Sequence, residues 1–275
     1  MRPGALVLIS AMSSLRAVVE QLTPEADGFV IDAPEDWGQG RTLYGGMTAA
    51  LAYEAVKRAH GELAPLRSAQ FSFIGPATGR LRFTSTLLRR GRSSTIIAAD
   101  GFNEEGPAAR ALFVFGAARE SKIAHNFIAR PEVAAPEACP SFRKEGAAAP
   151  RGFWSNFETR LAAGHRLLDK SATRAEFAVW TRFLDTGGAN PTTALLAIAD
   201  CLPPAAMVLF ASPAPISTMT WGVDIAHVPE SADAWHLLWS GSEQASEGYS
   251  LQNMAMWSQA GELIAVGRQA VAIFV

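Results

Sequence analysis

Residues 42–50 of the chain read TLYGGMTAA, with two glycines at the front of a run that is otherwise typical of a helix. Apolar and small residues recur at helical spacing from Met47 to Val56, so the sequence predicts a helix over 45–60 with one apolar face. Glycine in a helix interior costs about 1 kcal/mol relative to alanine. Two glycines at the start of a helix therefore indicate that the backbone is approached closely there.

Strand-like runs follow this helix, and each is bounded by turn residues. Two of them end at Pro76 and Gly91, and the next forms a long hairpin that turns around Gly106. Residues 121–151 then differ in composition, because proline and alanine are frequent and hydrophobic periodicity is weak. Such a segment is typical of a linker.

The same order of elements recurs after the linker. The sequence predicts a strand over 180–184, a helix over 190–202 with Asn190 as its N-cap, and a series of strands to the C-terminus. We therefore expect two units of similar architecture, at residues 1–120 and 152–275.

Landmark residues of the two units match in order and spacing. Pro76 and Pro229 each end the first long strand after the helix, and Gly106 and Gly261 each lie in the last hairpin turn. The residues of each pair are separated by nearly the same length of chain. We predict an α+β fold in which each unit wraps an antiparallel sheet around one helix, and the two sheets join edge to edge because free sheet edges need partners.

Composition and charge exclude several classes of protein. The chain has 275 residues, 49% of them hydrophobic, and a formal net charge of −2, so it lacks the basic surface that nucleic-acid binding requires. Its only cysteines, Cys139 and Cys201, form neither a disulfide framework nor a metal-ligand set, which suits a reducing cytoplasm. No run approaches the ~20 apolar residues of a membrane-spanning helix. The apolar stretch at 5–12 is too short for a convincing signal peptide, so we expect a cytoplasmic protein.

The stretch TLYGGMTAALAYEAV resembles the glycine-led central helix of hotdog-fold proteins. The duplicated layout is similar to that of the double-hotdog acyl-CoA thioesterases, in particular the bacterial type II enzymes for medium and long chains. The resemblance runs from about Asp27 to the C-terminus, apart from the linker. It implies an N-terminal and a C-terminal hotdog, and hydrolysis of acyl-CoA to a free acid and CoA in fatty acid metabolism. It also implies that no cofactor or metal is used, and that the chain forms a homo-oligomer, such as a dimer of double-hotdog chains.

In that family an Asp, a Thr and a Gln of the second hotdog hold the attacking water. The resemblance assigns these roles to Asp200 in AIADCLPP, Thr218 in PISTMTWGVD and Gln269 in VGRQAVAIF. The strand after the Thr departs from the family pattern, so Thr220, on the same face of a regular strand, is the alternative. The segment CLPPAA that begins after Asp200 is less bulky than in the family, which leaves the acyl chain length open.

The chemistry of these residue types agrees with thioester hydrolysis. A carboxylate can take a proton from water, and a hydroxyl and an amide can hold the same water molecule. The helix N-terminus led by Gly45 and Gly46 offers N–H groups and the positive end of a dipole to the oxyanion. Since the helix of the second half has no such glycines, the pair either serves the Asp200 site from the other half or marks a vestigial second site.

Two further groups are candidates for binding the substrate. Met207, Phe210 and Trp221 are expected to line an apolar channel for the acyl chain between helix and sheet. Arg89 and Arg90 belong to the densest basic cluster of the chain. This cluster either meets the phosphates of CoA or forms a solvated strand end.

Other functions remain as alternatives. A hotdog enoyl-CoA hydratase uses a His paired with an acid, and His227 and His236 do not match that pattern. A nucleophile at Cys201 is disfavoured, because adjacent residues on a helix point about 100° apart and Asp200 is its neighbour. A non-catalytic acyl-CoA-binding protein is the third alternative, in which the polar residues only satisfy one another. Release of free thiol from acyl-CoA separates a thioesterase from both the hydratase and the binding protein.

Overall fold

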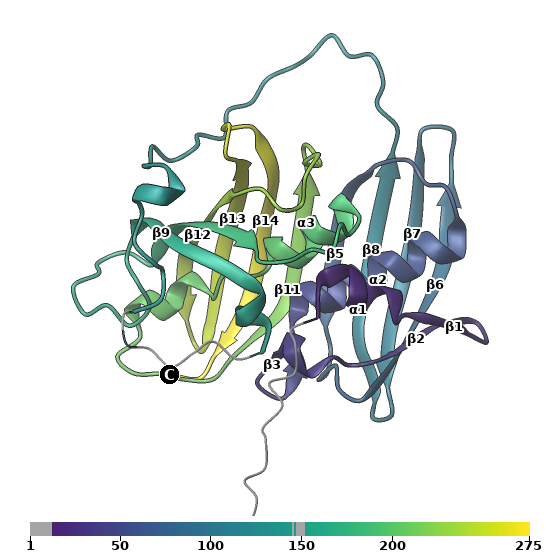
Figure 1. Cartoon of the computed structure of the whole chain (residues 1–275), viewed down its shortest axis with the longest axis horizontal. Helices are drawn as coiled ribbons and strands as arrows, with labels where there is room; N and C mark the ends of the chain where they lie inside the picture. The colour runs from purple at the N-terminus through teal and green to yellow at the C-terminus, as the bar shows by residue number, and fades with distance from the viewer. Residues whose placement is uncertain (1–12, 145, 147–151) are drawn as a thin grey trace, which may run out of the picture.

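Twelve strands form one continuous antiparallel sheet in the computed structural model, which describes residues 13–144, 146 and 152–275 (Figure 1). The strand order is β1-β2-β6-β7-β8-β5-β11-β14-β13-β12-β10-β9, so each half supplies six neighbouring strands. The stretch at 5–12 lies outside the described residues. Within the described part of the chain, no helix is both long and apolar enough to cross a membrane.

The elements of the first half are α1 (Leu15–Glu20), β1 (Thr23–Glu25), β2 (Gly28–Asp32), the 3-10 turn η1 (Glu35–Trp37), β3 (Gly38–Gln39), β4 (Thr42–Leu43), α2 (Gly45–His60), β5 (Leu66–Phe73), β6 (Arg80–Arg90), β7 (Ser94–Asn103) and β8 (Gly106–Gly116). The elements of the second half are η2 (Pro136–Ala138), η3 (Gly152–Asn156), β9 (Phe157–Gly164), β10 (Glu176–Phe183), α3 (Pro191–Ala199), η4 (Ala205–Leu209), β11 (Ile216–Ile225), β12 (His236–Ser246), β13 (Tyr249–Ser258) and β14 (Leu263–Ile273).

Both predicted helices are present, and they differ in how well their ends were predicted. The helix over 45–60 is confirmed at both ends. Asn190 caps α3 by accepting from the N–H groups of Thr192 and Thr193, as expected, but the helix ends at Ala199 and not at residue 202. The helix cannot continue through Pro203, because proline has no N–H to donate to the carbonyl of Ala199 and its ring would clash with that carbonyl.

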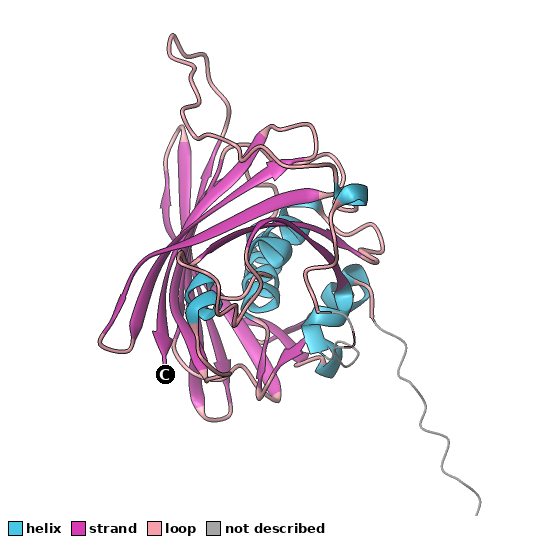
Figure 2. Ribbon diagram, turned by 90° about the vertical axis from the view of Figure 1, so that its left-hand side faces the viewer, coloured by secondary structure: helices cyan, strands magenta, loops and turns pink. Residues whose placement is uncertain are grey.

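The sheet curves around the helices, which lie inside it (Figure 2). The two halves meet where β5 pairs with β11, which confirms the predicted edge-to-edge joining. At this seam Phe71 is opposite Trp221, and their rings stack with centroids 5.0 Å apart. Both side chains are buried in the core that is shared by the two halves.

Three β-bulges recur at equivalent places and support the predicted duplication. They interrupt β5 and β11, β6 and β12, and β8 and β14. The extra residues are Arg67 and Met219, Leu88 and Glu243, and Ala108 and Ile264. A bulge changes which face each later residue occupies, so matched bulges preserve matched inward positions. The equivalence of the two halves can therefore be read residue by residue.

Part of the segment expected as a linker packs against the second half. The Trp180 indole N–H on β10 donates to the carbonyl oxygen of Ala134 at 2.9 Å, and the guanidinium of Arg130 lies 5.5 Å from the Trp180 ring. Cys139 is buried in the same apolar cluster. Residues 130–139 therefore contribute to the packing of the second half.

Candidate active site

Asp200 is the C-cap residue that directly follows α3, and it faces a pocket of about 590 Å³. The pocket is bounded by the β3–β4 turn, the start of α2, the β5–β6 loop and the start of β11. Asp200, Thr218 and Gly45 all contribute to its lining. The structure thus brings residues from both halves to one pocket of the size that small-molecule sites usually have.

The Gly45–Gly46 pair lies against the C-terminal end of α3. A Cβ on Gly45 would lie 2.6 Å from Asp200 Oδ2, and a Cβ on Gly46 would lie 2.6 Å from the carbonyl oxygen of Ala197. Both distances are too short for carbon and oxygen, so neither position has room for a side chain. The N–H of Gly46 donates a hydrogen bond to Asp200. The helix N-terminus of the first half therefore serves the carboxylate of the second half.

Tyr44, which directly precedes the Gly45–Gly46 pair, also holds the start of α2 against the end of α3. Its hydroxyl donates to the carbonyl oxygen of Ala197 at 2.8 Å, and its ring stacks on Phe153 with centroids 4.2 Å apart. Tyr44 is fully buried, and burial raises the pKa of its phenol well above the usual value. The phenol stays protonated and acts as a donor to the end of α3.

Gln269 lies on β14 and is hydrogen-bonded to Asp200. Its Nε2 donates to Asp200 Oδ1 at 2.5 Å, and its Oε1 accepts from Gln252 Nε2 on β13 at 2.7 Å. Gln252 Oε1 in turn accepts from the backbone N–H of Ala205 at 2.8 Å. Both glutamines are buried, so the side-chain amides form a chain that ends on the carboxylate.

The surroundings of Asp200 raise its pKa. Burial of the carboxyl group raises the pKa from 3.8 to about 7, although hydrogen bonds from Gln269 and the Gly46 N–H act in the opposite direction. Such a carboxyl changes its protonation state near neutral pH and is suited to accept and return a proton. Burial also raises the pKa of the neighbouring Cys201 thiol, which keeps it protonated and unreactive.

The bulge in β11 distinguishes Thr218 from its alternative. Thr218 pairs with Val271 and Thr220 pairs with Ala270, and successive residues of β14 point to opposite faces of the sheet. Thr218 therefore shares the inner face with Gln269, whereas Thr220 is exposed on the outer face. The expectation that both threonines face the same side is wrong, because the bulge inserts an extra residue between them. Among the described residues, Thr218 makes no hydrogen bond to Asp200 or Gln269.

The equivalent positions of the first half do not form a second site. The matched bulges place Leu66 at the position of Thr218 and Phe113 at that of Gln269. Glu54 corresponds to Asp200 on the helix, but it accepts a hydrogen bond from the Thr193 hydroxyl and lies 3.3 Å from Lys57 Nζ. The Glu54 carboxylate is thus already paired with Thr193 and Lys57. Within the described part of the chain, the combination of Asp, Thr and Gln occurs only in the second half.

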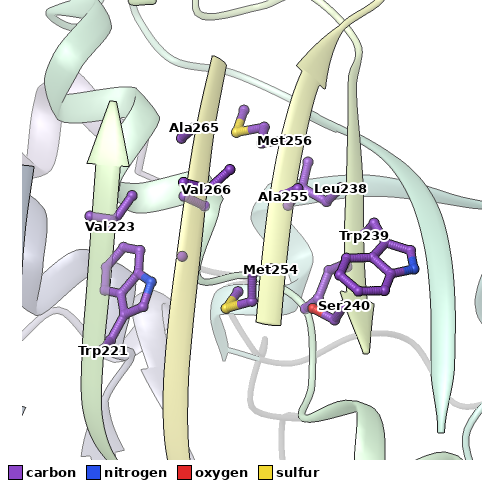
Figure 3. Close-up of a pocket in the computed structure, with 13 residues that line it drawn as sticks. Trp221, Val223, Leu238, Trp239, Ser240, Met254, Ala255, Met256, Ala265 and Val266 are labelled. Atoms are coloured by element: carbon purple, nitrogen blue, oxygen red, sulfur yellow. The ribbon is translucent and has the colours of Figure 1, made fainter. Parts of the chain in front are cut away.

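The residues expected to line an acyl channel, Met207, Phe210 and Trp221, are not part of the lining of the Asp200 pocket. Met207 and Phe210 pack with Val271 in a separate apolar cluster outside the lining of the Asp200 pocket. Trp221 is opposite Gln269 in the register and, with Ala199 at the end of α3, lines a narrow cavity of about 20 Å³ (Figure 3). That cavity is also lined by Met254, and in this structure it has room for about one water molecule.

The basic cluster is also far from the pocket. Arg90 lies near His60, since the positive charge of Arg90 adds to the effect of burial in lowering the pKa of His60. His60 ends α2, and a helix of 16 residues is about 24 Å long, so Arg89 and Arg90 lie at the end of α2 remote from Gly46. They are not among the residues that line this pocket, and their contact with the phosphates of CoA stays a prediction. Among the described residues that line the pocket, Arg41 is the one cation.

Tyr44, Gln252 and Arg41 were not among the site residues predicted from the sequence. Gln252 carried a usable signal, because it alternates with Ser250 and Met254 on a strand and therefore points inward. Tyr44 directly precedes Gly45 and Arg41 lies four residues before it, yet their neighbours in space come from distant parts of the chain. The pocket lining contains no histidine among the described residues, which gives no support to a hydratase.

Family models of the acyl-CoA thioesterases match both halves of the chain. The model of the acyl-CoA thioesterase N-terminal domain matches residues 33–116, and the model of the C-terminal domain matches residues 136–273. The curated proteins include no match to this chain.

Solved structures share the fold over nearly the whole chain. A conserved hot dog fold protein of unknown function from Alicyclobacillus acidocaldarius has a TM-score of 0.84 at 24% identity and covers 94% of this chain and 97% of its own. The tesB protein of Mycobacterium avium subsp. paratuberculosis has a TM-score of 0.77 at 17% identity, with 96% and 100% covered. The acyl-CoA thioesterase II TesB2 from Mycobacterium marinum has a TM-score of 0.75 at 17% identity, with 95% and 98% covered. At these identities the likeness establishes the double hotdog fold and nothing more.

Proposed function

Because this chain belongs to the acyl-CoA thioesterase family and is a thioester hydrolase, we propose that it hydrolyses acyl-CoA in the pocket between its two halves. In this proposal Asp200, Thr218 and Gln269 hold the attacking water. One observation carries the assignment: Asp200 has a pKa raised to about 7, lines the pocket and receives hydrogen bonds from Gln269 and the N-terminus of α2.

The proposed reaction uses a single carboxyl group as base and then as acid. The Asp200 carboxylate takes a proton from water while the water oxygen bonds to the thioester carbonyl carbon. Thr218 lies on the same face as Gln269 and positions this water. The tetrahedral intermediate then collapses, the C–S bond breaks, and the proton on Asp200 returns to the departing CoA thiolate. The products are a carboxylic acid and free CoA.

The N-terminus of α2 supplies the oxyanion with positive potential. The first turn of a helix has N–H groups without intrahelical partners, and the helix dipole places partial positive charge there. Gly46 donates to Asp200, and Gly45 lies in the pocket lining beside the carboxylate. Donors at this place stabilise the charge that develops on the carbonyl oxygen, which contributes to the rate where water is excluded.

The pocket lining suggests how the two ends of the substrate are bound. Phe73, Ile74 and Ile216 offer an apolar wall to the acyl group, and Arg41 lies at the polar rim. The guanidinium of Arg41 matches the geometry of a phosphate, so we assign it to the phosphates of CoA. Arg89 and Arg90 do not line this pocket.

The cellular setting is part of the proposal. We infer a role in cytoplasmic fatty acid metabolism, as in the family that the chain resembles. The cysteines Cys139 and Cys201 are both free and buried, which agrees with a reducing compartment. We also infer a dimer of double-hotdog chains, which the molar mass of the native protein in solution tests.

Thiol release tests the function directly. The chain is incubated with acyl-CoAs of graded length, and free CoA is followed with a chromogenic disulfide reagent. We expect thiol release from at least one chain length, and we expect Asp200→Asn to remove most of it. The control is Asp224→Asn, which changes an exposed carboxylate on β11 and should leave the rate unchanged. Absence of thiol release from every acyl-CoA, together with loss of the double bond of an enoyl-CoA, would instead identify a hydratase.

A further inference from the structure

We propose that Gln252 is a positioning residue for thioester hydrolysis, which sets the direction of the Gln269 amide and thereby keeps a donor on Asp200. The inference rests on the proposed function and goes beyond it, since Gln252 touches neither the carboxylate nor the pocket lining.

The direction of the chain is imposed by a backbone group. The N–H of Ala205 can only donate, so the group that faces it must be the oxygen of Gln252, at 2.8 Å. The amide nitrogen of Gln252 then points to Gln269, whose oxygen must face it at 2.7 Å. This leaves the nitrogen of Gln269 directed at Asp200 Oδ1. Reversal of either amide would bring donor to donor or acceptor to acceptor.

Burial makes this order difficult to reverse. Gln252 has no exposed surface and Gln269 has 2% of its surface exposed, so water does not replace a lost partner. A buried polar group without a partner is costly, and a half-satisfied chain is therefore unstable. The two glutamines have one arrangement that satisfies every member.

The anchor of the chain is itself held by local structure. Ala205 is the first residue of η4 and follows the pair Pro203–Pro204, whose rings fix two backbone φ angles. The bonded N–H therefore has a defined place at the end of the segment that follows Asp200. This gives a role to the CLPPAA stretch, in which the sequence departs from the family it resembles.

The consequence of the chain is a donor on the ionised carboxylate. The Gln269 N–H favours the charged form of Asp200, as does the N–H of Gly46. The other titratable groups beside the carboxyl are Tyr44 and Cys201, and burial keeps both in their protonated forms. If Gln252 no longer holds the oxygen of Gln269, the amide is free to turn its oxygen toward Asp200. The carboxylate then loses a donor, and its proton is released only at higher pH.

The test is the pH dependence of kcat and KM for two variants. Gln252→Met removes both polar groups at similar size, and Gln252→Glu, as the carboxylate, keeps an acceptor for the Ala205 N–H but cannot donate to Gln269. We expect each variant to move the acidic limb of the kcat profile to higher pH by about one unit, to lower kcat at pH 7 about fivefold as a result, and to change KM less than threefold. The matched control is Gln70→Glu, at an exposed position on β5.

The outcomes separate this inference from the proposed function. If the wild-type protein releases thiol, Asp200→Asn does not, and both folded Gln252 variants keep the wild-type kcat and pH midpoint, the positioning role is overturned and the function stands. A lower melting temperature with an unmoved midpoint likewise overturns it, because a purely structural residue gives that result. If Gln252→Met does not fold, Gln252→Glu alone decides.

Discussion

Gly45→Ala adds one methyl group at the contact between the two halves. Its Cβ would lie 2.6 Å from Asp200 Oδ2 and 3.2 Å from Cζ of Phe73. The backbone at Gly45 is helical, so alanine introduces no strain in φ or ψ, and the only obstacle is contact with these two side chains. Ordinary contact between a methyl carbon and an oxygen begins at 3.4 Å, so the carboxylate must move by about 0.8 Å.

That displacement should affect catalysis much more than folding. Misplacement of a reacting group by about 1 Å can lower a rate by 10²-fold, which corresponds to about 2.7 kcal/mol of transition-state stabilisation. It also stretches the 2.5 Å hydrogen bond from Gln269 to Asp200. Stability should change little, because alanine is favoured over glycine in a helix by up to about 1 kcal/mol and this gain offsets the local crowding.

The assay is kcat/KM for thiol release, measured together with the thermal midpoint. We expect Gly45→Ala to lose about 10²-fold in kcat/KM with a midpoint close to that of the wild type. Two alanine variants serve as controls. Gly222→Ala places a Cβ in open space on β11 and should change neither quantity. Gly46→Ala meets the backbone oxygen of Ala197 and should lower the midpoint. Wild-type activity in Gly45→Ala would refute the assigned contact with Asp200.

Three further predictions follow from the same contacts. Arg41→Ala should raise KM for acyl-CoA about fivefold or more, but not KM for an acyl-pantetheine that lacks the nucleotide. Arg90→Ala should change neither KM value, so equal effects of the two variants would contradict the assignment of Arg41 to the CoA phosphates. Asp200→Asn should raise the melting temperature at pH 8. The native pKa of Asp200, about 7, exceeds its value in the unfolded chain, so the wild type loses stability on the order of a few kcal/mol as pH rises from about 4 to 7. The higher melting temperature of the variant should vanish below pH 4, where the carboxyl is protonated in both states. Thr193→Val removes the hydrogen-bond donor to the buried Glu54. It should lower the free energy of unfolding, measured by denaturant titration, by about 1–3 kcal/mol, while kcat stays within twofold of the wild type. A lower kcat would indicate that the Glu54 carboxylate takes part in the reaction.

The helices and the duplicated sheet could be predicted because their signals are local. The 3.6-residue period of the Gly45–His60 helix and the Asn190 cap of α3 lie within single turns of chain. The short strands β1, β3 and β4 were not predicted, since two or three residues carry no readable period. The eight-residue β9 was missed as well, at Phe157–Gly164, where burial alternates only weakly.

The site could be predicted only in part, because its order depends on long-range packing. Asp200 and Gln269 are 69 residues apart and hydrogen-bonded, and only the family resemblance pointed to them as members of one site. The bulge that separates Thr218 from Thr220 has no signature in the sequence, so a regular strand was assumed. The clustering of basic residues in the sequence favoured Arg89, whereas the cation that lines the pocket is the isolated Arg41. A ligand meets the charges that lie near its pocket in space, and clustering along the sequence does not reveal which ones these are.

The pH dependence of kcat/KM for thiol release, measured side by side for the wild type and Asp200→Asn, tests the central claim most directly. We predict that the wild-type rate rises with pH through a midpoint near 7, the pKa to which burial raises the Asp200 carboxyl. We predict that Asp200→Asn lacks this limb and is slower by about 10²–10⁴-fold, the usual contribution of a general base. A limb of the same midpoint and height in Asp200→Asn would show that another group activates the water and would contradict the account.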